Sequence, residues 1–259
     1  MKYILFFTSC IFILLQGCTK PSNSDTTHFL STGIPIISSL TTIPDTVDNY
    51  IMVWSTQYLN VRPSDASTSF SSSVSAFFMN QNAGALTAAG KICTLNAHNS
   101  YLYSYNDSNK KADGIAMLGA NLTVSTSGTT SVPAISKTMY MPKKLFTGIF
   151  QKNTYDGTTT NPISFTWQTD STNFNQVMIQ VDKLMTSTST TVGAYSTTYV
   201  VADNGSYTLP NTFCTNWPVG TMFNITLGRA TETIHTAPNG RKTYIYGIVT
   251  AQTGQMKYK

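Results

Sequence analysis

The chain has 259 residues, enough for a leader and one large or two ordinary domains, and only 10% of its residues are charged. Its formal net charge of +5 comes from basic residues scattered singly or in pairs, so the clustered stripe typical of nucleic-acid binding is excluded and no nucleic-acid partner is expected. Ser, Thr, Asn and Tyr are abundant and Glu232 is the sole glutamate, a composition typical of β-structure rather than of long helices.

The N-terminal stretch has the pattern of a secretory leader. Met1-Lys2 precedes an uncharged apolar run from Tyr3 to Leu15, and Leu15-Gln16-Gly17-Cys18 ends that run with a small residue before a cysteine. This ending resembles the lipobox of bacterial lipoproteins. The resemblance implies a signal peptide over residues 1–17 and a diacylglycerol on the sulfur of Cys18. An ordinary signal peptide followed by a chance cysteine is the alternative.

The lipid sets the expected location. No later run of about 18 apolar residues exists, so Cys18 is the expected membrane anchor. Thr19, rather than Asp, follows Cys18, which the lipoprotein resemblance associates with sorting to the outer membrane. We therefore expect a lipid-anchored protein of the bacterial outer membrane, on the cell surface or the periplasmic face.

Two segments follow the leader in the N-terminal half. Residues 18–49 are rich in Ser, Thr and Pro, which predicts a flexible tether, although Ile34-Pro35-Ile36-Ile37 is apolar enough to dock as an edge strand. Short alternating runs then predict an N-terminal β domain over residues 50–145. Its expected strands are 51–54, 73–79, 91–95, 101–105, 118–124 and 137–141, with a polar turn at 106–114.

A Lys-rich, Gly-containing passage at 143–156 marks the expected domain boundary, so that a second β domain covers 146–259. Strands are expected at 163–167, at 177–181 as its partner, and at 199–202, 207–209, 222–227 and 244–249. Between two of them, Asp203-Asn204-Gly205 is a signal for the tight turn that joins antiparallel strands.

Three motifs of this second half carry a resemblance. They are Phe165-Thr166-Trp167, Asp203-x-Gly205-x-Tyr207 and Trp217-Pro218-Val219-Gly220-Thr221-x-Phe223. Together they resemble a core strand, a tyrosine corner and a pre-strand turn of fibronectin type III and immunoglobulin-like sandwiches, over about 100 residues and without a cysteine pair. The expected fold is all-β, with two β-sandwich-like domains of which the C-terminal one is immunoglobulin or fibronectin type III-like. Such a fold implies no activity by itself.

The sequence offers little material for catalysis. His28, His98 and His235 are not spaced as metal ligands, and the acidic segment 107–114 places Lys110 and Lys111 where a calcium ion would lie. Most aspartates lie in polar turns, where their side chains bond neighbouring amides. The S-x-x-K spelling at 108–111 lacks the companion motifs of penicillin-binding proteins. We expect no metal, no cofactor and no enzymatic activity.

Two cysteines remain beyond the leader and the lipidation site. Cys93 and Cys214 are a possible disulfide in an oxidising envelope compartment. The alternative is two separate buried thiols that behave as small apolar side chains. The apolar alternation around Cys93 favours the two separate thiols.

Aromatic residues are the candidates for ligand binding. Tyr101, Tyr103 and Tyr105 share one face of the expected strand at 101–105 and could present a platform for sugar rings. The alternative is that these rings pack against another sheet, which is favoured because Tyr is common on β-faces. Finding the three rings buried would remove the glycan hypothesis. Trp217, in a turn, is a second candidate, with the alternative that it plugs the end of the sandwich.

These observations lead to a non-catalytic, lipid-anchored envelope or surface protein that binds a glycan or protein ligand, as in adhesion. A structural envelope lipoprotein that only contacts membrane-protein partners is the alternative. An uncharacterised hydrolase comes third.

Overall fold

The computed structural model describes residues 49–59, 69–78, 81–96, 100–106, 109–145, 154–155, 162–172, 176–183, 196–253 and 255–259. The expected leader, the lipidation site Cys18 and all but the last residue of the expected tether lie outside these ranges, as do His28 and His98. Asn49, the last residue of that tether, is already the first residue of a strand.

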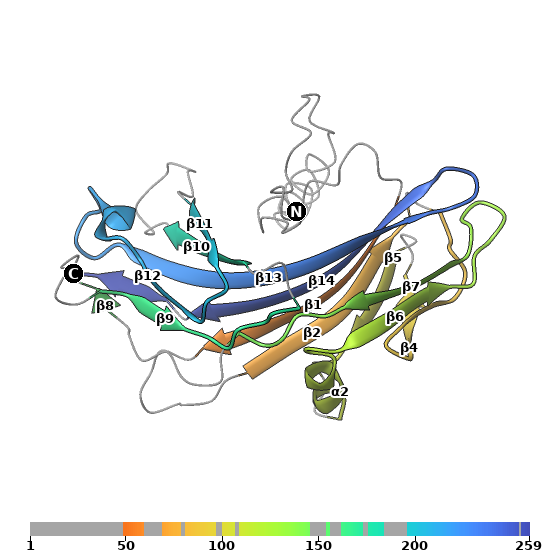
Figure 1. Ribbon diagram of the computed structural model, residues 1–259, viewed down its shortest axis with the longest axis horizontal. Helices are drawn as coiled ribbons and strands as arrows, with labels where there is room; N and C mark the ends of the chain where they lie inside the picture. Colours follow the sequence, from red (N-terminus) through yellow and green to blue (C-terminus); the bar gives the residue numbers. More distant parts are fainter. Residues whose placement is uncertain are drawn as a thin grey trace, which may run out of the picture.

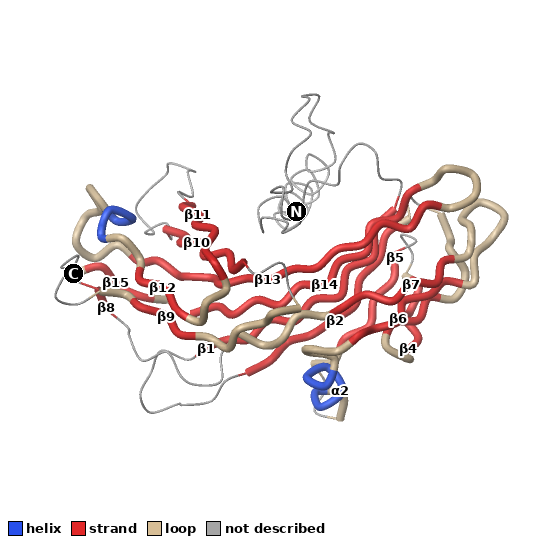
Figure 2. Tube along the Cα trace, viewed as in Figure 1, coloured by secondary structure: helices blue, strands red, loops and turns tan. Residues whose placement is uncertain are grey.

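The described chain is all-β in class, as expected, and Figure 2 shows strands along much of its length. The N-terminal half contains β1 (Asn49–Leu59), β2 (Ser69–Phe77), β3 (Leu86–Ala88), β4 (Lys91–Leu95), β5 (Ser100–Ser104), β6 (Asn121–Thr126) and β7 (Ile135–Tyr140). The C-terminal half contains β8 (Thr154–Tyr155), β9 (Ser164–Thr166), β10 (Gln176–Lys183), β11 (Ser196–Ala202), β12 (Ser206–Thr208), β13 (Met222–Thr236), β14 (Lys242–Thr253) and β15 (Met256–Tyr258). The short helix α2 (Lys111–Ala116) occupies part of the expected turn at 106–114, and a single 3-10 turn, η3 (Asn211–Cys214), precedes β13.

One mixed sheet of thirteen strands runs through both halves of the chain. Its order is β11-β10-β13-β14-β1-β2-β5-β4-β3-β6-β7, with β15 and β8 attached beside β13, and β12 and β9 form a separate pair. At its centre β1 pairs in parallel with β14, from Asn49 opposite Thr243 to Leu59 opposite Thr253. The boundary expected at 145/146 therefore does not divide the sheet.

Strict alternation in β1 assigns the two faces of this sheet. Ile51 and Val53 are fully buried, whereas the intervening Met52 and Trp54 are only partly buried. Because successive side chains of a strand point to opposite faces, the apolar odd-numbered residues turn toward the interior. The even-numbered ones contribute to a second, aromatic face, described below.

Two hydrophobic cores lie on the interior face. The first gathers Ile51, Val74, Phe78, Leu86, Tyr101, Val124, Met139 and Met141 with Ile245 and Val249 of β14. The second gathers Leu145, Ile163, Phe165, Val177, Ile179, Phe223, Ile225 and Leu227 with Leu59 of β1. The expected boundary thus falls between two cores. Each core also contains residues from the other half of the chain, Ile245 and Val249 in the first and Leu59 in the second.

Different elements cover the two cores, which gives the architecture of a sandwich. Residues of β6 and β7 belong to the first core, and β9 with the segments around it belongs to the second. Figure 1 shows these strands on one side of the long curved sheet. The edge strand β7 folds back over the middle of the same sheet. There the Thr231 hydroxyl of β13 donates a hydrogen bond to the carbonyl oxygen of Tyr140 in β7.

Two expected strand pairings are wrong. The strand β10 pairs with β11 and β13, and β9 pairs with β12. Consequently the turn at Asp203-Asn204-Gly205 does not close a hairpin but carries the chain from β11 in the large sheet to β12 in the small one. Gly205 has a φ of +91°, a backbone conformation that glycine adopts readily, and this allows the chain to turn from one sheet to the other.

Candidate functional site

A buried polar cluster, here called the Arg229 cluster, lies on the interior face around Arg229 of β13. Arg229 Nη2 forms an ion pair with Asp203 Oδ1 at 2.8 Å, and the two side chains are 0% and 1% exposed. The same guanidinium donates to the carbonyl oxygen of Gln168, and Trp167 Nε1 donates to Asp203 Oδ1 at 2.7 Å. A fully desolvated pair needs such additional partners to be tolerated.

Asp170 extends the Arg229 cluster. Its carboxylate accepts hydrogen bonds from the Tyr140 hydroxyl at 3.0 Å and from the backbone amides of Lys143 at 2.8 Å and Thr172 at 3.2 Å. Its own amide donates to Asp203 Oδ2 at 3.1 Å. Burial and the neighbouring carboxylate raise the pKa of Tyr140 to about 12. Both carboxylates are committed to fixed donors, so the Arg229 cluster ties β7, β9 and β13 together and does not offer a free base.

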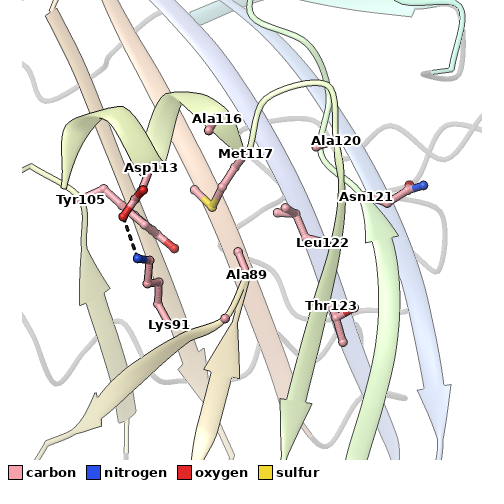
Figure 3. A pocket seen from close by; sticks show the side chains of 11 residues that line it. Ala89, Lys91, Tyr105, Asp113, Ala116, Met117, Ala120, Asn121, Leu122 and Thr123 are labelled. Atoms are coloured by element: carbon pink, nitrogen blue, oxygen red, sulfur yellow. Dashed lines mark ion pairs between the residues drawn. The ribbon is translucent and has the colours of Figure 1, made fainter.

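The candidate site is a cleft of about 520 Å³ beneath helix α2, on the N-terminal half of the molecule. That volume lies in the range of small-molecule sites. Figure 3 shows side chains from α2, from β4 and from β6 converging on it. The lining consists of Ala89, Gly90, Lys91, Tyr105, Asp113, Ala116, Met117, Ala120, Asn121, Leu122 and Thr123.

One ion pair crosses the cleft. Lys91 Nζ lies 2.7 Å from Asp113 Oδ2, and the side chains are 37% and 48% exposed. The hydrogen bond and the charge of Asp113 raise the pKa of Lys91, so the ammonium stays protonated. The pair therefore presents one fixed donor and one fixed acceptor side by side, and their charges cancel.

Tyr105 contributes a hydroxyl without a described partner. The residue is 2% exposed, and its oxygen is buried with no hydrogen bond among the described residues. Burial, together with the charge of Asp113, raises its pKa, which keeps the hydroxyl protonated as a donor. In Figure 3 this hydroxyl points into the space between Lys91 and Met117. An unmade hydrogen bond of a buried donor costs about 1–3 kcal/mol, which an acceptor in the cleft would recover.

Helix α2 reaches the sheet because Gly114 has no side chain. A Cβ there would lie 2.8 Å from Tyr105 Cβ and 3.2 Å from Ser72 Cβ, closer than packed atoms allow. The helix is only six residues long, so its position depends on this packing rather than on its own propensity.

Gly114→Ala is therefore expected to destabilise the protein, although the same change in an exposed helix stabilises by about 1 kcal/mol. Overpacking against Tyr105 and Ser72 should cost about 1–3 kcal/mol and lift α2 from the cleft. Thermal unfolding and hydrogen exchange of residues 109–118 measure both effects. Ala112→Val, at an exposed position of the same helix, is the control and should change little. A Gly114→Ala variant that is more stable than the unaltered protein would show that α2 does not pack closely against Tyr105 and Ser72 at this position.

The tyrosine row shares one face, as expected, but that face is the interior. Tyr101 and Tyr105 are each 2% exposed and Tyr103 is partly buried, whereas Leu102 between them is 52% exposed. The Tyr101 hydroxyl donates to the carbonyl oxygen of Gly84 at 2.7 Å, and its ring packs edge-on against Phe78. The stacking platform for sugar rings is therefore wrong. Of the three tyrosines, only Tyr105 is part of the cleft lining, and its hydroxyl is buried beneath the surface of the cleft.

Cys93 and Cys214 are both free and buried, which agrees with the alternative of two separate thiols. They cannot meet, because Cys93 belongs to the first core and Cys214 to the second. Burial raises the pKa of Cys93 to about 11, so its thiol stays protonated. Trp217 packs against Phe213 and Phe223 at ring distances of 5.6 and 5.5 Å, at the end of the second core.

The exterior face of the sheet carries an aromatic cluster that sequence analysis did not single out. It consists of Ala230, Tyr244, Tyr246 and Ile248, with Tyr50, Met52 and Trp54 packed against them. Glu232 stands opposite Tyr246 in the register, and its buried Oε2 atom has no hydrogen-bond partner among the described residues. Loss of hydration raises the pKa of Glu232 to about 7.

Glu232 should make the protein less stable as the pH rises. Its pKa is raised from 4.5 to about 7 in the fold, so the folded state holds this proton more tightly than the unfolded chain. The stabilisation is complete below pH 4.5 and is lost as the pH rises through about 7. Because the residue is partly exposed, we expect only about 1 kcal/mol. Glu232→Gln should flatten this slope between pH 5 and pH 8 in thermal unfolding, while unchanged slopes in the two proteins would refute the assignment.

Comparison with known proteins adds no relative: no family model matches the chain, and no curated protein matches it. Within the described residues no group of three His, Cys, Asp or Glu side chains could hold a metal ion. No described helix is long and apolar enough to cross a membrane.

Proposed function

We propose that this protein is a non-catalytic, lipid-anchored envelope protein that binds a ligand in the cleft beneath α2. The observation that supports this most is the unpaired hydroxyl of Tyr105 beside the Lys91–Asp113 pair in a hollow of about 520 Å³. Polar groups that converge on a pocket with apolar walls are the usual make-up of a binding site. Burial of the tyrosine row removes the glycan hypothesis that rested on those rings. The cleft supports a glycan on a different ground, the hydrogen-bonding groups of Lys91 and Asp113 in its lining.

The carboxylates of the cleft and of the Arg229 cluster are all paired with other groups, which favours binding over hydrolysis. Asp113 is neutralised by Lys91, and the lining residues that the structure describes include no histidine, cysteine or second carboxylate. Hydrolysis of a glycoside needs two carboxylates across the scissile bond. The two buried carboxylates of the Arg229 cluster, Asp170 and Asp203, are occupied by amide, hydroxyl and guanidinium donors.

The binding function is tested by filling the cleft. Ala116 lines the cleft from the exposed end of α2, and Ala112 lies on the same helix outside the lining. We expect Ala116→Trp to abolish retention on an immobilised glycan panel, while Ala112→Trp retains it. Equal retention by the two variants, or none by the unaltered protein on any glycan, would count against the proposal.

The anchor has its own test. Cys18→Ser should move the protein from the membrane fraction to the soluble fraction, because the lipid is the proposed attachment and a single substituted atom removes its site. Immunoblotting of fractionated cells measures the shift, which should be nearly complete. Cys10→Ser, in the leader, is the matched control and should leave the protein on the membrane. Membrane retention of Cys18→Ser would exclude the lipid anchor.

A further inference from the structure

We infer that the cleft recognises a neutral sugar residue that carries an N-acetyl group. This inference rests on the proposed binding function and names the ligand class for the same site. It follows from three properties of the lining: its cancelled charge, its paired donor and acceptor, and a buried donor surrounded by methyl-sized apolar groups.

Charge comes first. Lys91 and Asp113 are the charged members of the lining, and they neutralise each other at 2.7 Å. A charged ligand would find the charges of these two residues already paired, so it would give up hydration without full compensation. A neutral ligand avoids this cost.

The pair also fits the hydroxyls of a sugar ring. A hydroxyl both donates and accepts, so two adjacent ring hydroxyls can donate to Asp113 and accept from Lys91 at once. Asn121 and Thr123, at exposed positions of β6, are further polar residues of the lining, but in Figure 3 the side chain of Asn121 points away from the ion pair. Such charge-assisted hydrogen bonds are roughly twice as strong as neutral ones, which suits a ligand that the cleft holds without stacking.

The acetamido group is indicated by what surrounds Tyr105. Its hydroxyl is a protonated donor without a described partner, and the remaining lining is methyl-sized or flexible and apolar, namely Ala89, Ala116, Ala120, Met117 and Leu122. An acetamido group combines a strong acceptor oxygen with one methyl group. The hydroxyl lies just below the surface of the cleft, so a shift of the flexible Met117 side chain would open the contact.

The test uses the detergent-solubilised full chain with N-acetylglucosamine, N-acetylgalactosamine, glucose and glucosamine as probes. In saturation-transfer NMR we expect the acetyl methyl protons to receive the strongest transfer, with dissociation constants near roughly 1 mM because a small neutral ligand makes few contacts. Glucose and the cationic glucosamine should bind at least about fivefold more weakly, the worth of one hydrogen bond. Equal binding of glucose and the N-acetyl sugars would overturn the inference.

Tyr105→Phe separates a ligand contact from a structural role. It removes the unpaired hydroxyl, so the free energy of unfolding should stay the same or rise, while affinity for the N-acetyl sugars falls by about fivefold. Tyr103→Phe, on the neighbouring ring outside the lining, should change neither. Unchanged affinity in Tyr105→Phe would overturn the inference.

The closing experiment also distinguishes the two proposals. If a glycan without an acetamido group binds and Ala116→Trp blocks it, the cleft is the binding site and the N-acetyl inference is wrong. If N-acetyl sugars bind equally well to Ala116→Trp, they bind elsewhere and both proposals fail. Binding of N-acetyl sugars that is lost in Ala116→Trp and weakened in Tyr105→Phe supports both.

Discussion

Replacing Asp203 by alanine should destabilise the protein by about 3–5 kcal/mol, because it leaves the guanidinium of Arg229 buried without a counter-charge. Both side chains of this pair are at most 1% exposed, so water cannot replace the lost carboxylate. Trp167 Nε1 and the amide of Asp170 lose their acceptor as well. A loss of this size should lower the melting temperature by roughly 10 °C or more in a domain of this length.

The Lys91–Asp113 pair is the matched control for this prediction. Its N–O distance, 2.7 Å, is no longer than the 2.8 Å between Arg229 and Asp203, but its side chains are 37% and 48% exposed. Exposed ion pairs contribute about 0–1 kcal/mol, so Asp113→Ala should have little effect on unfolding. Similar losses in Asp203→Ala and Asp113→Ala, measured by urea denaturation, would contradict the importance of burial.

A double variant tests the reason for the loss. If the cost of Asp203→Ala comes from an unpaired buried charge, removal of that charge by Arg229→Met should recover part of it. The single variant Arg229→Met should in turn be costly, because Asp203 then keeps only its bonds from Trp167 and from the amide of Asp170. A double variant as unstable as the sum of the two single ones would show that the charges act independently.

The all-β class could be predicted from sequence because it depends on local alternation. Ile51 and Val53 against Met52 and Trp54 show the period of two directly, and the structure places them on opposite faces of β1. The same period put Tyr101 of β5 and Tyr105, just past its end, on one side, and the structure agrees, but period alone does not say which side is the interior. That depends on which strands cover the sheet, here β6 and β7.

Long-range pairing was not predictable. The expected division into two domains did not include the pairing of β1 with β14, which joins both halves in one sheet, because no local pattern links Asn49 to Thr243. In the same way Gly205 marked a turn, but nothing near Asp203 shows that its carboxylate meets Arg229 of β13. The cleft combines residues from the turn after β3, from β4, α2 and β6, and the six-residue α2 is too short for helical periodicity to show.

Gly247 should not tolerate a side chain. It lies in β14 on the interior face, where β7 returns over the centre of the sheet, and a Cβ there would be 2.9 Å from Thr231 Oγ1 and 3.1 Å from the carbonyl oxygen of Tyr140. The nearest atom of all is the terminal methyl of Met139, which is flexible. The methyl group of Met139 can move aside, but the Tyr140 carbonyl and the Thr231 hydroxyl cannot, because they are hydrogen-bonded to each other.

We therefore expect Gly247→Ala to cost about 1–3 kcal/mol and Gly247→Val to cost more, since each added atom forces β7 further from the sheet. Met139→Ala should restore only a small part in the double variant with Gly247→Ala, because the contacts with Thr231 and the Tyr140 carbonyl remain. Hydrogen exchange should rise in β7 first, and thermal unfolding gives the size of the loss. Complete rescue by Met139→Ala would mean that the side chain alone fills this space, and that the return of β7 to β13 and β14 does not require a glycine.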